Sequence, residues 1–140
     1  MDKPIQSNPP IQSNPIPKNP VLTNIQTINE FKQILIDNPG VVIIKFGAEW
    51  CGPCKQIDGL VKTLFGYMPN SVQNYMLDID ENMEVYSFLK NKKMVNGVPA
   101  ILAYYKGNVS HIPDDSIVGA NPPGIESFFR RCVNRAKNHV

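Results

Sequence analysis

The stretch VVIIKFGAEWCGPCK, residues 41 to 55, joins an apolar run to two closely spaced cysteines. Residues 41 to 46 are mostly β-branched or aromatic, which is typical of a central strand that is covered on both faces of a sheet. Pro53 suits the first turn of a helix, because the N–H that proline lacks would have no partner there. The stretch therefore predicts a buried strand, a short turn and a helix that begins at Cys51.

Two uses of a closely spaced cysteine pair are disfavoured by the surrounding sequence. Covalent haem attachment requires a histidine directly after the second cysteine, and this chain has Lys55 there. A structural zinc site takes four ligands, usually as two spaced pairs. The remaining candidate ligands do not pair at such a spacing: Cys132, His111 and His139. We therefore expect no metal site.

A redox-active dithiol fits the local context better. At the start of a helix, the free backbone N–H groups and the helix dipole stabilise the thiolate of Cys51, which is the nucleophilic form. Cys54 lies about one turn further on and on the same side, so the two sulfurs can form a disulfide. Gly52 has no side chain, which leaves the approach to Cys51 open.

The rest of the chain alternates predicted strands and helices. The expected strands are 21–25, 41–46, 72–79, 100–105 and, after a turn at 106–108, 109–112. Helices are expected after Thr27, after the cysteine pair, around 84–90 and from Pro122 onward. Thr27 and Glu30 predict a capping box at the first of these helices. This alternation, with two adjacent strands late in the chain, predicts an α/β domain with a mixed sheet.

The predicted last helix has one apolar stripe and one basic face. The stripe consists of Ile125, Phe128, Phe129, Cys132, Val133 and Ala136. Cys132 is therefore interpreted as a small apolar core residue and not as a regulatory thiol. The basic face carries Arg130, Arg131, Arg135 and Lys137. We interpret these side chains as a solvated surface and not as a nucleic-acid site.

Composition limits the possible classes of protein. A chain of 140 residues is about one domain long, and its net charge of +2 is too small to indicate a nucleic-acid or polybasic membrane partner. No apolar run approaches the roughly 20 residues that span a bilayer. The first residues, MDKPIQSNPP, lack the apolar core of a secretory signal, and three cysteines are too few for a disulfide-rich scaffold. We therefore expect a cytoplasmic protein with no membrane or nucleic-acid partner.

Residues 1–20 differ in composition from the remainder. The hexapeptide PIQSNP occurs twice in tandem, IPKNP follows, and six of the 13 prolines lie before residue 21. Such a segment buries too little apolar surface to offset its conformational entropy, so it is predicted to be a disordered Pro/Asn-rich tail. We interpret it as a tether or solubilising segment, with a partner-docking motif as the alternative. The folded domain is predicted to span residues 21–140.

From about residue 21 onward, the chain resembles the thioredoxin family. The resemblance rests on AEWCGPCK (48–55), GVPA (97–100) and VGA (118–120), in family order and at about family spacing. It implies the thioredoxin fold, an α/β fold with a central mixed five-stranded sheet flanked by four helices. It also implies a monomer that reduces protein disulfides, receives electrons from a thioredoxin-reductase-like donor and needs no cofactor beyond a Cys51–Cys54 disulfide.

The resemblance also implies roles for individual residues. Cys51 attacks the substrate disulfide and Cys54 resolves the mixed disulfide that results. Val98-Pro99 is the cis-proline turn that packs beside the cysteines. Trp50 shields the pair, although an ordinary core tryptophan is the alternative interpretation. The implied docking surface comprises Trp50, Gly97, Val98, Pro99 and Gly119.

Several positions depart from the family pattern. Lys45 stands where the family carries a buried aspartate, and Met76 stands where a lysine often partners that aspartate. Gly59 replaces the proline that kinks the helix, and Gly47 replaces an aromatic or small polar residue. Lys45 could act as a substitute proton acceptor or as a cation that lowers the cysteine pKa values. Alternatively, its head group reaches solvent at the sheet edge or pairs with a carboxylate such as Asp78.

The leading functional hypothesis is a thiol–disulfide oxidoreductase that reduces protein disulfides. Gly52-Pro53 between the cysteines favours reduction, because more oxidising relatives tend to carry histidine there. A binding or scaffold protein on a thioredoxin fold is the first alternative, favoured by Lys45 and by the unusual tail. A disulfide oxidase or isomerase is the second.

Overall fold

The computed structural model describes residues 19–138 of the chain, and most of the predicted tail, residues 1–18, lies outside them. Five strands form one mixed sheet in the order β1-β3-β2-β4-β5. The strands are β1 (Val21–Leu22), β2 (Val41–Gly47), β3 (Val72–Asp78), β4 (Ala100–Tyr105) and β5 (Asp115–Val118). The helices are α1 (Ile28–Ile36), α2 (Gly52–Gly66), α3 (Met83–Asn91) and α4 (Pro122–Asn138). The predicted mixed five-stranded sheet with four helices is confirmed.

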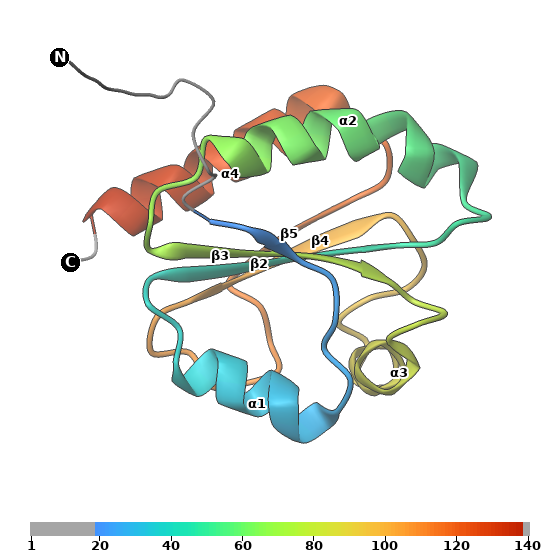
Figure 1. Ribbon diagram of the computed structural model, residues 1–140, viewed down its shortest axis with the longest axis horizontal. Helices are drawn as coiled ribbons and strands as arrows, with labels where there is room; N and C mark the ends of the chain where they lie inside the picture. Colours follow the sequence, from blue (N-terminus) through green and yellow to red (C-terminus); the bar gives the residue numbers. More distant parts are fainter. Residues whose placement is uncertain (1–18, 139–140) are drawn as a thin grey trace, which may run out of the picture.

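Helices cover both faces of the sheet (Figure 1). One apolar cluster packs α1 and α3 on one face, and a second packs α2 and α4 on the other. The first three strands are mutually parallel, whereas β4 runs antiparallel to β2, and β5 antiparallel to β4. The carboxyl ends of β2 and β3 therefore lie at the same edge, where β4 begins.

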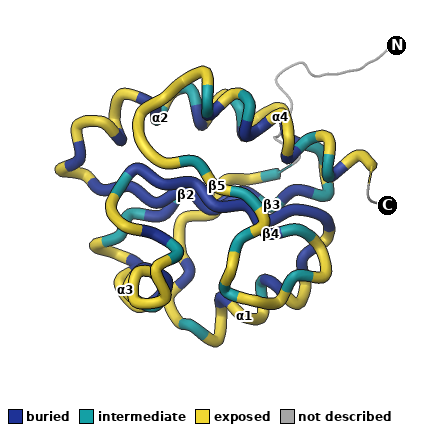
Figure 2. Tube along the Cα trace, turned by 180° about the vertical axis from the view of Figure 1, so that it is seen from behind, coloured by how far each residue is buried: buried dark blue, intermediate teal, exposed yellow. Residues whose placement is uncertain are grey.

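Strand β2 occupies the centre of the sheet and is buried along its whole length, as the apolar run predicts (Figure 2). Side chains alternate between the two faces of a strand. Val42, Ile44 and Phe46 pack in the cluster of α1 and α3, whereas Val41 and Ile43 pack in the cluster of α2 and α4. By the same alternation, the side chain of Lys45 points into the layer between the sheet and α2.

The first helix begins with the predicted capping box, shifted by one residue in its second half. The Thr27 hydroxyl oxygen accepts a hydrogen bond from the backbone N–H of Glu30 at 3.0 Å. The Glu30 carboxylate accepts from the backbone N–H of Gln26 at 2.8 Å, one residue before the N-cap. The two interactions satisfy one backbone donor in the first turn of α1 and one just before the helix.

The stripe on α4 packs as predicted. Cys132 is fully buried in the cluster between α4, α2 and the sheet, where Phe65 and Phe129 meet edge to face at a centroid distance of 5.4 Å. Two of the four basic residues contact the domain. Arg131 forms two hydrogen bonds with Asp115 at 2.7 and 3.1 Å, and the Arg135 guanidinium lies 4.8 Å from the centroid of the Tyr105 ring.

The predicted strand at 109–112 is wrong, and the last strand is β5, residues 115–118. A loop precedes it because polar side chains bind nearby backbone groups. The Asn108 carboxamide donates to the Ile112 carbonyl at 2.9 Å and accepts from the Ser110 N–H at 2.9 Å. These bonds compete with strand pairing, which resumes where the Asp114 N–H donates to the Ala103 carbonyl at 2.9 Å.

The first strand is shorter than predicted, at two residues instead of five. Just before it, the Asn19 side-chain amide donates to the carbonyl oxygens of Met68 and Pro69 in the loop after α2. Asn19 therefore contacts the domain, although the sequence pattern assigns it to the tail. No helix within residues 19–138 is long and apolar enough to cross a membrane.

Candidate active site

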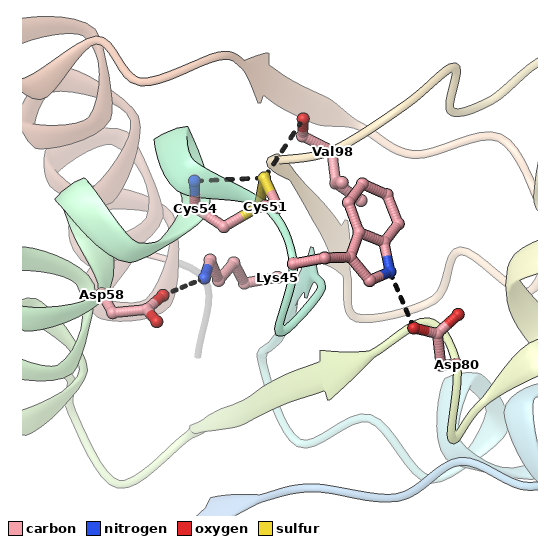
Figure 3. Close-up of a disulfide and its surroundings, with 7 residues drawn as sticks. Lys45, Cys51, Cys54, Asp58, Asp80 and Val98 are labelled. Atoms are coloured by element: carbon pink, nitrogen blue, oxygen red, sulfur yellow. Dashed lines mark hydrogen bonds and ion pairs between the residues drawn. A yellow bond between two sulfur atoms is a disulfide. The ribbon is translucent and has the colours of Figure 1, made fainter.

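Cys51 and Cys54 form a disulfide at the point where β2 gives way to α2 (Figure 3). Their Cα atoms are 5.3 Å apart. Cys51 is the N-cap of α2, and its sulfur accepts a hydrogen bond from the Cys54 N–H at 3.2 Å. Cys51 is 5% exposed and Cys54 is 1% exposed. The predicted placement of Cys51 at a helix N-terminus is therefore what the chain adopts, and a thiolate there would meet free N–H groups.

A loop from the other side of the sheet faces the disulfide. The Val98-Pro99 peptide bond is cis, as the resemblance implies, and the Val98 carbonyl oxygen lies 3.8 Å from the Cys51 sulfur (Figure 3). A disulfide sulfur carries no hydrogen, so this is a packing contact in the oxidised state. Two hydrogen bonds fix the loop, from the Gly97 N–H to the Tyr86 hydroxyl at 3.1 Å and from the Gly119 N–H to the Pro99 carbonyl at 2.9 Å.

Glycine is required at two of these positions by the backbone. Gly97 has φ +101° and Gly119 has φ +85°, both in the left-handed region that residues with a Cβ rarely adopt. Three loops thus lie in sequence at the site: one before α2, one before β4 and one after β5. The loop before β4 contacts Cys51 through Val98, and the loop after β5 is joined to it by the hydrogen bond from Gly119 to Pro99.

Trp50 is not a core residue, because its side chain is 68% exposed. Its indole N–H donates to a carboxylate oxygen of Asp80 at 2.8 Å (Figure 3). The backbone N–H of Asp80 in turn donates to the Asp78 carboxylate at 2.8 Å. Sequence reasoning missed Asp80, and no local pattern signals it, because the contact joins residues 30 positions apart. A Cβ placed on Gly52 would have no neighbour within 4 Å, so the approach beside Cys51 is open.

Lys45 is 2% exposed, and its ammonium group pairs with the carboxylate of Asp58 on α2 (Figure 3). The alternative in which its head group reaches solvent is therefore wrong. The alternative of pairing with a carboxylate is right, but the partner is not Asp78. Asp78 uses its carboxylate to accept the Asp80 N–H instead. Asp58 was detectable in principle, because it follows Cys54 by four residues and so lies one turn along the same helix face.

A pocket of about 150 Å³ lies beneath the disulfide. Its lining includes Lys45, Gly47, Cys54, Asp58 and Asp78. The sulfur of Cys54 thus shares a small polar space with an ion pair that is buried at Lys45, while Asp58, whose side chain is 37% exposed, connects that space to solvent. A charge in this pocket acts on the sulfur more strongly than a charge on the surface, because less water screens it.

The third cysteine takes no part in the site. Burial raises the pKa of the Cys132 thiol to about 12, since a thiolate is disfavoured in apolar surroundings. Within residues 19–138, no group of three or more His, Cys, Asp or Glu side chains could hold a metal ion. His139, which the sequence leaves as a possible ligand, lies outside the described residues.

A disulfide at a helix N-terminus that faces a cis-proline loop defines a thiol–disulfide oxidoreductase. The family model for thioredoxin matches residues 22–131, and the chain belongs to the thioredoxin family. The thioredoxin fold is confirmed by a crystal structure of thioredoxin from Malassezia sympodialis. It has a TM-score of 0.66 and 27% identity, and the match covers 84% of this chain and 95% of that one.

Curated relatives agree with this assignment. Thioredoxin-2 of Saccharomyces cerevisiae is 30% identical over 106 residues, which cover 76% of this chain and 93% of the yeast protein. The chloroplastic Thioredoxin M2 of Arabidopsis thaliana is 31% identical over 102 residues, which cover 71% of this chain. The matched region spans half the length of that plant relative.

Proposed function

We propose that this protein reduces disulfides in other proteins, with Cys51 as the nucleophile and Cys54 as the resolving thiol. The observation that carries the assignment is the position of Cys51 as the N-cap of α2, with its sulfur already accepting a backbone N–H. Cys54 is more deeply buried than Cys51, which makes Cys51 the more accessible sulfur. Gly52 leaves space for a substrate, and Pro53 fixes the first helical turn.

The reaction transfers two electrons to the substrate. The Cys51 thiolate attacks one sulfur of the substrate disulfide, and the other substrate sulfur leaves as a thiolate that takes a proton. Cys54 then loses its proton and attacks the Cys51 sulfur, so that the second substrate sulfur leaves in the same way. The products are a substrate dithiol and the Cys51–Cys54 disulfide. No further cofactor enters this scheme.

The substrate surface in this proposal comprises Trp50, Gly97, Val98, Pro99 and Gly119. The exposed indole of Trp50 offers apolar contact area beside the disulfide. The cis-proline loop offers backbone groups to an extended substrate segment, in the manner of strand addition. The same site would receive electrons from a thioredoxin-reductase-like donor. All of its residues come from one chain, so a monomer is sufficient, and we propose the cytoplasm, a reducing compartment, as its place of action.

Insulin reduction in the presence of dithiothreitol tests this assignment. The wild-type protein should accelerate the reaction, whereas Cys51→Ser should leave only the background rate. Cys54→Ser should accumulate a mixed disulfide with the substrate, because the resolving step is missing. Cys132→Ser is the matched control and should retain the wild-type rate. A wild-type rate equal to the dithiothreitol background would refute the proposed function and favour a binding role for the fold.

A further inference from the structure

Among residues 19–138, Lys45 is the one charged residue of the buried core, and the dithiol scheme does not use its ion pair with Asp58 beneath the disulfide. Lys45 comes from the central strand, and Asp58 comes from the helix that begins at Cys51. The other charged residues of the pocket have partners of their own. Lys55 pairs with Glu49 across 3.7 Å at the surface, and Asp78 accepts the Asp80 N–H. Lys45 and Asp58 are therefore the ion pair that borders the buried sulfur of Cys54, and Asp78 is a further anion of the lining that the variants below leave unchanged.

Gly47 determines how closely the ammonium approaches that sulfur. A Cβ at position 47 would lie 3.1 Å from the Lys45 nitrogen and 3.6 Å from the Cys54 sulfur. The nitrogen and the sulfur thus border the same small space, and the sum of the two distances limits their separation to about 7 Å. A side chain at this position would crowd the ammonium and separate it from the sulfur. The absence of one leaves the cation in electrostatic reach of Cys54.

We propose that Lys45 and Asp58 act as a balanced pair that sets the redox poise of the dithiol. The proposal rests on the proposed function, because it concerns the same two cysteines. Two electrons from a dithiol reductant break the Cys51–Cys54 bond, and each sulfur anion then either keeps its charge or takes a proton from water. The Lys45 ammonium stabilises the anionic, thiolate form of the reduced cysteine pair. Asp58 holds the Lys45 ammonium in place and offsets part of its charge, so both residues are positioning residues.

The two members of the pair should have effects of opposite sign. Asp58→Asn leaves the cation unopposed, so the thiolate forms at lower pH. Lys45→Met leaves the anion of Asp58 near the sulfurs, so the thiolate forms at higher pH. A shift of about one pH unit in each direction is expected for a unit charge near a partly buried thiol. The double variant is neutral like the wild-type pair, and its titration should return close to that of the wild type.

The test measures the rate of Cys51 alkylation by iodoacetamide against pH in reduced protein, with Cys132→Ser as the background for every variant. At a pH below the midpoint, the rate should rise about tenfold in Asp58→Asn and fall about tenfold in Lys45→Met. Asp58→Glu keeps the charge and should follow the wild type. Equilibration with glutathione buffers provides a second readout, in which Asp58→Asn should be the easier protein to reduce and Lys45→Met the harder.

A purely structural role for the pair would shift both single variants in the same direction or leave the titration curves superimposable, and either result overturns the proposal. If Lys45→Met does not fold, Asp58→Asn and the neutral double variant still decide the matter. The former must shift to lower pH, and the latter must not. Alkylation requires no protein substrate, so insulin reduction can fail while the opposed shifts persist, or continue in variants whose titrations coincide. The two failures are therefore distinguishable.

Discussion

Asp80 should control the orientation of Trp50, and the chain provides a direct way to measure this. Trp50 is the single tryptophan of the sequence, its side chain is 68% exposed, and its indole N–H donates to Asp80 at 2.8 Å. An exposed hydrogen bond of this kind contributes about 1 kcal/mol. Asp80→Ala should therefore lower the population of the held indole orientation, relative to free ones, about fivefold.

The assay is the steady-state fluorescence anisotropy of Trp50, which reports on this ring alone. Asp80→Ala should lower the anisotropy and increase quenching by acrylamide, while the melting temperature falls by only about 3 °C. Because the proposed substrate surface includes Trp50, kcat/KM for insulin reduction should fall by up to about fivefold. Glu81→Ala is the matched control. It removes the same charge from the same turn, and the hydrogen bond from Gln26 goes to the Glu81 backbone carbonyl, which the substitution retains.

An Asp80→Ala protein with wild-type anisotropy and quenching would show that packing, and not this hydrogen bond, holds the ring. If Glu81→Ala lowered kcat/KM as much as Asp80→Ala, the general negative charge of the turn would be responsible. Either result would refute the role assigned to Asp80, which is to orient Trp50 at the proposed substrate surface.

Three further predictions concern the rest of the domain. Phe128→Ala leaves a cavity at a fully buried site beside Phe129. Chemical denaturation should therefore show a loss of about 3–5 kcal/mol in the free energy of unfolding, and a loss below about 1 kcal/mol would contradict this packing. Since burial raises the pKa of Cys132 to about 12, iodoacetamide at pH 8 should leave Cys132 unlabelled in reduced native protein but label all three cysteines in denatured protein, as mass spectrometry of the peptides would show. The unfolded thiol has the lower pKa, near 9.0, so the contribution of this group to stability is present below that pH and declines above it. Deletion of residues 1–18 should leave the melting temperature nearly unchanged, and a large drop would show that the domain extends into that segment. Asn19→Ala should instead lower the free energy of unfolding by about 1 kcal/mol, because it removes the side-chain hydrogen bonds to Met68 and Pro69.

The elements that the sequence predicts well are those whose pattern is periodic and whose ends carry local chemistry. Strand β2 is buried at every position, as an unbroken apolar run implies, and α1 begins where Thr27 caps it. The predicted strand at 109–112 failed because Val109 and Ile112 look like strand residues but are 61% and 56% exposed. Side-chain hydrogen bonds from Asn108 decide the conformation there, and an apolar pattern does not register that competition.

In the candidate site, too, features set by neighbouring residues were predicted and those set by distant residues were not. The cysteine pair and its helix follow from adjacent residues, and the cis-proline loop was placed by resemblance. Contacts between residues that are distant in the sequence were not predicted. Asp80 reaches Trp50 across 30 positions, and nothing near either residue in the sequence indicates the contact. The contact between Asp80 and Trp50 therefore depends on how the turn after β3 packs beside the site.

Lys45 shows most clearly how far a buried charge can be interpreted from sequence. A lysine within a buried run requires a partner, so a carboxylate was predictable in kind. Its identity depended on two nonlocal facts. Strand alternation directs Lys45 toward α2, where Asp58 lies one turn beyond Cys54. The candidate that the sequence suggested, Asp78 on β3, instead accepts the Asp80 N–H. Gly47, which has no side chain, then leaves the space that the Lys45 side chain needs. Lys45 and Gly47, which look like separate departures from the family pattern, are thus accounted for by one arrangement: a buried cation on the strand, its anion on the helix, and the sulfur of Cys54 in the same pocket.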